Sequence, residues 1–130
     1  MASHYLTLIP PLSLVALFGG ASLSAQTTID YRDPAVLARE LEQAPQRFVL
    51  IDVRTPEEYR DGHIPGAINI HFRQIGQAMA DEDRAQVVVV YCTRGRRSGI
   101  AAIRLRSMGY RNVHDFGGIG RWSGPLVQEG

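Results

Sequence analysis

Four short segments of the chain are rich in β-branched and aromatic residues, and the segments between them carry apolar residues at helical spacing. A continuous apolar run of this length is typical of a strand that is buried on both faces of a sheet. The residues Gln86 to Tyr91, with four consecutive valines, form the most apolar of these runs. The pattern predicts strands at residues 47–53, 67–72, 86–91 and 111–116.

The first helix is predicted by its boundary residues as well as by its periodicity. Asp33 can cap the helix, and Pro34 suits the first helical position. From Leu37 onward, apolar residues recur at i, i+4 and i+7, and Pro45 ends the helix.

Two more helices are predicted by local signals, and residues 73–83 predict a weak one. Thr55, Pro56 and Glu58 form a capping box, in which a threonine caps the helix and a glutamate reaches back to it. Glu58 is interpreted here as the capping-box partner only. The last helix follows Gly95 and ends at Gly109, which we expect to adopt a left-handed conformation.

Strands that alternate with helices indicate an α/β domain with a parallel sheet. In such sheets, ligands bind outside the carboxyl ends of the strands. Two stretches of reactive or charged residues follow predicted strands. They are Asp-Val-Arg at 52–54 and Cys-Thr-Arg-Gly-Arg-Arg-Ser at 92–98.

Composition narrows the classes of function. A chain of 130 residues suits one domain, and a net charge of +1 gives no indication of nucleic-acid binding. All 14 basic residues are arginine, which excludes lysine chemistry. The single cysteine excludes an internal disulfide and a zinc site built from several thiolates. No metal and no organic cofactor is predicted.

The N-terminal residues 1–25 differ from the rest. No charged side chain precedes Asp30, and an apolar centre at 12–18 leads into glycines and small residues. This layout predicts an export signal peptide cleaved after Ala25, with residues 26–130 as the domain and a periplasmic or other exported location. An uncleaved membrane anchor and a tail on a cytosolic protein are the alternatives.

The loop that follows Cys92 has the features of an anion site around a thiolate. It leads into a helix, and the free N–H groups of a helix N-terminus bind anions. Gly95 allows a positive φ, so that successive N–H groups can converge. Arg94, Arg96 and Arg97 add positive charge, and both features lower the pKa of a thiol. A buried core cysteine beside solvated arginines is the structural alternative.

Two chemistries fit a strand–cysteine–loop–helix unit: phosphoryl transfer through a phosphocysteine, and sulfur transfer through a persulfide. The tyrosine-phosphatase pattern places arginine six residues after the cysteine, followed by serine or threonine. Here Arg97 is five residues after Cys92, and Ser98 is sixth. The loop is one residue shorter, and a tighter cradle favours a single sulfur atom over a tetrahedral phosphate.

Three segments of the chain resemble the rhodanese family. Residues 92–98 are similar to its active loop, Cys-x-x-Gly-x-Arg-Ser; residues 50–70 resemble its upstream motif, and residues 107–122 its closing segment. The resemblance implies a five-stranded parallel sheet with helices on both faces. It also implies that Cys92 is the nucleophile and persulfide carrier, with the N–H groups of Thr93 to Ser98 around the outer sulfur.

The resemblance therefore implies a thiosulfate sulfurtransferase. Its partners would be thiosulfate or another sulfane-sulfur donor, and cyanide or a thiol as acceptor. The substrate-binding candidates are Thr93, Arg94, Gly95, Arg96, Arg97 and Ser98. Arg94 and Arg96 occupy positions that vary in the family, which leaves room for a bulkier anionic donor. A non-catalytic module that binds an anion or a partner is the alternative, followed by a cysteine-dependent phosphatase or arsenate reductase.

Asp52 and Arg54 are predicted at the same rim as Cys92, because both follow a neighbouring strand. They are candidates for an ion pair, or for hydrogen bonds, that support the active loop. The structural alternative is that Asp52 only satisfies loop N–H groups.

Overall fold

A computed structural model describes residues 28–129 of the chain. These residues form one parallel sheet of four strands in the order β2-β1-β3-β4. The strands are β1 (Phe48–Asp52), β2 (Ile68–Asn69), β3 (Val87–Cys92) and β4 (Asn112–Gly118). The α-helices are α2 (Pro34–Gln43), α3 (Pro56–Asp61), α4 (Ile75–Ala78) and α5 (Arg96–Ser107). Single 3₁₀ turns are η2 (Pro45–Arg47), η3 (Phe72–Gln74) and η4 (Ile119–Arg121).

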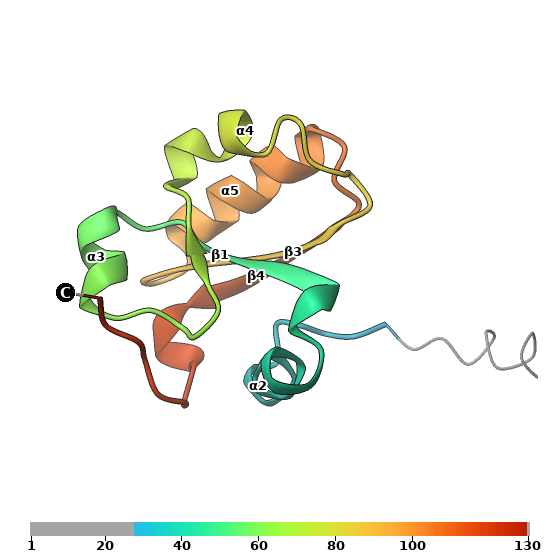
Figure 1. Ribbon diagram of the computed structural model, residues 1–130. Coiled ribbons are helices and arrows are strands. Elements are labelled where there is room, and N and C mark those ends of the chain that lie inside the picture. Colours follow the sequence, from blue (N-terminus) through green and yellow to red (C-terminus); the bar gives the residue numbers. More distant parts are fainter. Residues whose placement is uncertain (1–27, 130) are drawn as a thin grey trace, which may run out of the picture.

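Helices cover both faces of the sheet, which confirms the predicted α/β class. Figure 1 shows α4 and α5 on one face and α2 on the other, with α3 beside the end of β1. Alternate residues of β3 serve the two faces, because successive side chains of a strand point in opposite directions. Val88 and Val90 pack under α5, whereas Val89 and Tyr91 pack in the cluster that contains Leu37 of α2.

The predicted helix ends are confirmed. Asp33 accepts hydrogen bonds from two N–H groups of the first turn of α2. Thr55 and Glu58 make both bonds of the capping box at the start of α3. Gly109, after the end of α5, has a φ of 99°.

The sheet differs from the implied one in its number of strands. The resemblance implied five, but the described residues form four. Residues 28–33 are the only described residues ahead of α2, and Asp33 N–H donates to the Asp30 carbonyl at 3.1 Å in a turn. This turn delivers the chain directly into the helix, so no ladder forms there. The segment predicted as a strand at 67–72 also shortens, to the two residues of β2.

Within residues 28–129, no helix is long and apolar enough to cross a bilayer. The predicted signal peptide at 1–25 lies outside the described residues.

Candidate active site

Cys92 is the last residue of β3, at the carboxyl end of a central strand. Its side chain is 1% exposed. Thr93, Arg94 and Gly95 then turn the chain into α5, and Gly95 has a φ of 99°, as expected for the position that needs positive φ. A conformation of this kind favours glycine because it has no Cβ.

The loop surrounds the sulfur of Cys92 with hydrogen-bond donors. The N–H of Gly95 donates to Sγ at 3.0 Å, and the N–H of Ser98 donates at 3.3 Å. The Cys92 thiol donates to Ser98 Oγ at 3.4 Å, and the Ser98 hydroxyl donates to the Gly95 carbonyl at 3.1 Å. Two backbone N–H groups of the loop therefore converge on the sulfur of Cys92. A cradle of the N–H groups of Thr93 to Ser98 around an outer sulfur stays a prediction.

These contacts determine the direction in which the thiol titrates. Burial raises the pKa of Cys92, but the hydrogen bond with the Ser98 side chain and those from the N–H groups of Ser98, Gly95 and Arg94 outweigh it. The net result is a pKa below that of an ordinary cysteine. Hydrogen bonds to the charged form favour ionisation. The loop backbone and the Ser98 side chain thus lower the pKa of the thiol, and no arginine charge is among the largest causes.

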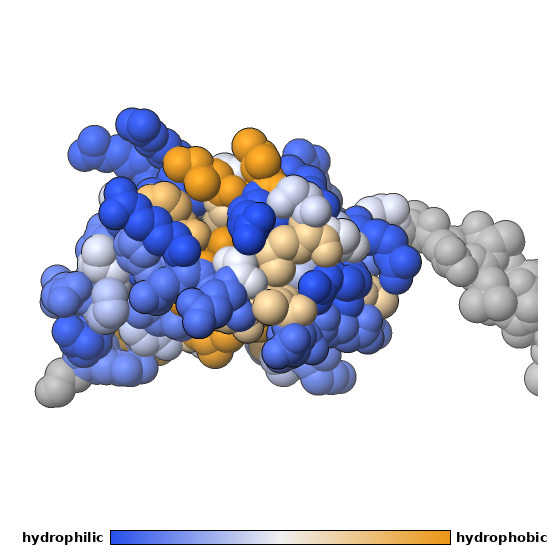
Figure 2. Space-filling view, turned by 90° about the horizontal axis from the view of Figure 1, so that it is seen from above, coloured by the Kyte–Doolittle hydropathy of each residue, from blue (hydrophilic) through white to orange (hydrophobic). Residues whose placement is uncertain are grey.

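A pocket of about 630 Å³ opens above the sulfur. It is much larger than one small inorganic anion and lies within the range of ordinary ligand pockets. Figure 2 shows the face formed by α4 and α5, where apolar side chains stand among charged ones. The pocket is lined by Glu58, Phe72, Arg73, Cys92, Thr93, Arg94, Arg96, Arg97 and Ile100.

Phe72 and Arg73 line the pocket opposite the loop and were not predicted from the sequence. They follow β2, whose carboxyl end lies at the same edge of the sheet as that of β3. The one signal that could have found them is the general rule that ligands bind outside the carboxyl ends of parallel strands. The residues themselves carry no motif that marks them.

The four arginines of the pocket are not equivalent. Arg97 donates to both oxygens of Glu58, at 2.8 and 3.0 Å. Arg73, Arg94 and Arg96 make no ion pair with any residue in the described part of the chain. Their positive charges are available to an anion, whereas that of Arg97 is compensated.

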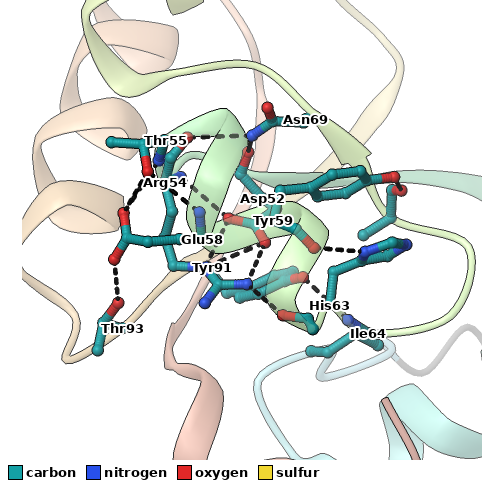
Figure 3. Close-up of polar contacts among 12 residues, drawn as sticks. Asp52, Arg54, Thr55, Glu58, Tyr59, His63, Ile64, Asn69, Tyr91 and Thr93 are labelled. Atoms are coloured by element: carbon teal, nitrogen blue, oxygen red, sulfur yellow. Dashed lines mark hydrogen bonds and ion pairs between the residues drawn. The ribbon is translucent and has the colours of Figure 1, made fainter. Parts of the chain in front are cut away.

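The interpretation of Glu58 as a capping-box partner only was wrong. Besides its bonds to Thr55, its carboxylate accepts a hydrogen bond from the Thr93 hydroxyl at 3.1 Å (Figure 3) and pairs with Arg97. The Arg97 guanidinium, above all, holds the pKa of this carboxyl well below its usual range. The capping box predicted where Glu58 lies in α3, but not that α3 faces the loop.

Asp52 and Arg54 form a buried ion pair, 0% and 6% exposed. Arg54 Nη2 lies 2.6 Å from an Asp52 oxygen and also donates to the Gly62 carbonyl at 2.7 Å (Figure 3). Asn69 donates to the carbonyls of both residues. Their side-chain hydrogen bonds join β1 to the chain after α3, and none of them reaches residues 93–98.

The end of β4 lies directly against the loop. A Cβ added to Gly118 would lie 2.7 Å from the Thr93 carbonyl oxygen, closer than any side chain tolerates. A Cβ on Gly95 would meet Gly117 at 3.7 Å. Gly118 therefore lets two backbones approach closely, a role that the sequence did not reveal.

In the range 28–129, no three His, Cys, Asp or Glu side chains gather in an arrangement that could hold a metal ion.

The chain is similar to known proteins. A family profile described as "Rhodanese-like domain" matches residues 33–124. The thiosulfate sulfurtransferase PspE of Escherichia coli (strain K12) is 42% identical over 80 residues, which cover 60% of this chain and 77% of that protein.

Two solved structures are similar in fold and sequence. One is described as a rhodanese with anions from E. coli. It has a TM-score of 0.56 and 41% sequence identity, and the match covers 62% of this chain and 96% of that protein. The other, the human single-domain sulfurtransferase TSTD1, has a TM-score of 0.57 and 30% identity and covers 63% and 83%.

Proposed function

This chain belongs to the rhodanese-like domain family and is a sulfurtransferase, and we propose that it carries sulfane sulfur as a persulfide on Cys92. The observation that carries the proposal is the pair of N–H groups, from Gly95 and Ser98, that converge on the cysteine sulfur. They stabilise the thiolate that must attack, and an outer sulfur bonded to Sγ would lie at the mouth of the same cradle.

Thiosulfate is the proposed donor. The Cys92 thiolate attacks the outer sulfur of thiosulfate, the bond between the two sulfurs of thiosulfate breaks, and sulfite leaves with the electron pair. The product is a Cys92 persulfide. The uncompensated charges of Arg73, Arg94 and Arg96 around the pocket suit an anionic donor, and the pocket volume leaves room for a larger one.

A nucleophile then removes the outer sulfur. Cyanide attacks it to give thiocyanate, or a thiolate attacks it to give a new persulfide, and in both cases the Cys92 thiolate is regenerated. The buried side chain of Ser98 lies beside the sulfur, with its Oγ 3.4 Å from Sγ. No metal or organic cofactor takes part in either step.

The test is the intact mass of the protein after treatment with thiosulfate. We expect a gain of one sulfur, about 32 Da, that cyanide removes with release of thiocyanate. Cys92→Ser should show no gain and no thiocyanate formation while it keeps its fold, since serine is similar in size to cysteine and far less nucleophilic. An unchanged parent mass, or thiocyanate formed by the serine variant, would contradict the mechanism.

We also propose that residues 1–25 direct export and that the mature protein begins near Gln26. The apolar run at 12–18 and the small residues before position 26 support this. N-terminal sequencing of protein recovered from the periplasm should find Gln26 as the first residue. Recovery with Met1 intact in a membrane fraction would favour the anchor instead.

A further inference from the structure

We propose that Glu58 is a positioning residue for Cys92: its carboxylate clamps the two ends of the active loop together. The inference rests on the proposed function in one respect, namely that Cys92 reacts as a thiolate. Glu58 lies in α3, outside the loop, and belongs to a different segment of the chain.

The clamp is made by one carboxylate that holds both limbs of the loop. Thr93 directly follows Cys92, and its hydroxyl donates to Glu58 Oε2 at 3.1 Å. Arg97 directly precedes Ser98, and its guanidinium donates to Oε1 at 2.8 Å and to Oε2 at 3.0 Å. Arg97 also donates to the Thr93 hydroxyl at 3.0 Å, which closes the ring of contacts.

The carboxylate is itself fixed by the start of α3. The Thr55 N–H and hydroxyl each donate to Glu58 Oε1 at 3.0 Å. In a capping box, the glutamate carboxylate needs to accept only the bond from the backbone N–H of the capping residue. The bonds to Thr93 and Arg97 therefore exceed what the helix needs, and they connect α3 to the loop.

The position of the clamp gives it influence over the sulfur. The N–H of Ser98 lies 3.3 Å from Sγ, and Ser98 is the residue after Arg97. If Arg97 and Thr93 separate, the N–H and hydroxyl of Ser98 move relative to Cys92. Because hydrogen bonds weaken steeply with distance and angle, a small displacement reduces the stabilisation of the thiolate.

The test uses Glu58→Ala and Glu58→Gln, with Glu57→Gln as a matched control. Glu57 is the neighbouring, exposed carboxylate of the same helix turn, and its ion pair is with Arg60. The readouts are the pH profile of Cys92 alkylation by iodoacetamide, and kcat and KM for thiosulfate. We expect E58A to shift the profile to higher pH and to lower kcat on the order of ten-fold, as for the loss of one charge-assisted hydrogen bond.

The glutamine variant separates the clamp from the charge. Glutamine keeps an acceptor oxygen of the same reach, so E58Q should show a smaller shift in the same direction, and E57Q should match the parent. A shift to lower pH in both Glu58 variants would overturn the proposal, since it would mean that the residue acts only as a negative charge that disfavours the thiolate.

Thr55→Ala distinguishes the clamp from the helix cap. This variant removes the side-chain cap of α3 and one of the two bonds from Thr55 to Glu58, but it leaves the bonds of Glu58 to Thr93 and Arg97. If E58A lowers the melting temperature as T55A does and leaves the alkylation profile unchanged, Glu58 only caps the helix. Alkylation measures the ionisation of Cys92 without any sulfur donor, so failure of the clamp and failure of the persulfide mechanism are measured separately.

Discussion

At the scale of single residues, the reactivity of Cys92 depends more on hydrogen-bond donors that point at its sulfur than on the charges of nearby arginines. The groups that lower its pKa are backbone N–H groups of the loop and the Ser98 side chain. The nearest arginine in sequence to Ser98, Arg97, is held by Glu58 and Thr93 instead. A fixed dipole at 3 Å acts on a thiolate more strongly than a solvated charge at the rim, because water screens the latter.

Replacement of Arg97 tests whether this residue matters to the loop. Arg97→Ala should lower kcat/KM for thiosulfate by the equivalent of about 1.5–3 kcal/mol, because a charged hydrogen-bond network is lost. Arg104→Ala is the matched control, an exposed arginine about two turns further along α5. Steady-state thiocyanate formation compares the two variants. Equal, small losses would show that both arginines are only solvated surface.

At the scale of elements, the site depends on the length of the turn between β3 and α5. One glycine inserted after Gly95 keeps the N–H of Gly95 in place but moves that of Ser98 by one position. We expect the rate of transfer from thiosulfate to fall on the order of 100-fold, as for the loss of a preorganised donor. Circular dichroism must show a folded variant. A folded insertion variant that transfers sulfur at the parent rate would contradict the role of loop length.

Activity should be equally sensitive to a substitution at the end of β4. Gly118→Ala would place a Cβ 2.7 Å from the Thr93 carbonyl, so the loop must shift. We expect kcat to fall roughly ten-fold or more, because small displacements of reacting groups are costly. Gly120→Ala is the control, since a Cβ there meets nothing within 4 Å. Equal rates for the two variants would mean that the loop absorbs the contact without loss.

Sequence reasoning succeeded where the signal is local. The caps at Asp33 and Thr55, the positive φ at Gly95 and the four strand segments all follow from patterns within a few residues. It failed where the contact joins distant segments. Glu58 contacts Thr93 and Arg97, and Gly118 approaches Thr93. No pattern within one segment predicts these contacts, because they depend on how the elements pack.

At the scale of the whole molecule, a buried polar layer connects the strands behind the site. The Asp52–Arg54 pair joins β1 to Gly62, and the buried Tyr91 hydroxyl of β3 accepts a hydrogen bond from the Ile64 N–H at 3.0 Å. Burial of such groups costs free energy unless each is bonded. The arrangement holds the chain after α3 against the central strands, and so holds α3 near the active loop.

Tyr91 makes this layer testable through pH. Burial, above all, raises the pKa of the Tyr91 hydroxyl, and the negative charge of Asp52 adds to the effect. In the unfolded chain a tyrosine has a pKa of about 10. Above that pH the unfolded chain loses a proton that the native protein retains. The free energy of unfolding therefore falls as pH rises, by up to about 1.4 kcal/mol per pH unit for this group.

Tyr91→Phe should remove the contribution of Tyr91 to that dependence. At pH 7 the variant should be less stable by about 1–3 kcal/mol, since the Ile64 N–H loses its acceptor inside the fold. Between pH 10 and 11 the gap should narrow, because only the parent carries Tyr91, which ionises in the unfolded chain and not in the native protein; the other tyrosines are common to both proteins. Cys92 does not contribute there, as its thiol is ionised in both states. Urea unfolding at pH 7, 10 and 11 measures the gap, and a gap that stays constant would show that Tyr91 titrates in the native protein as it does in the unfolded chain.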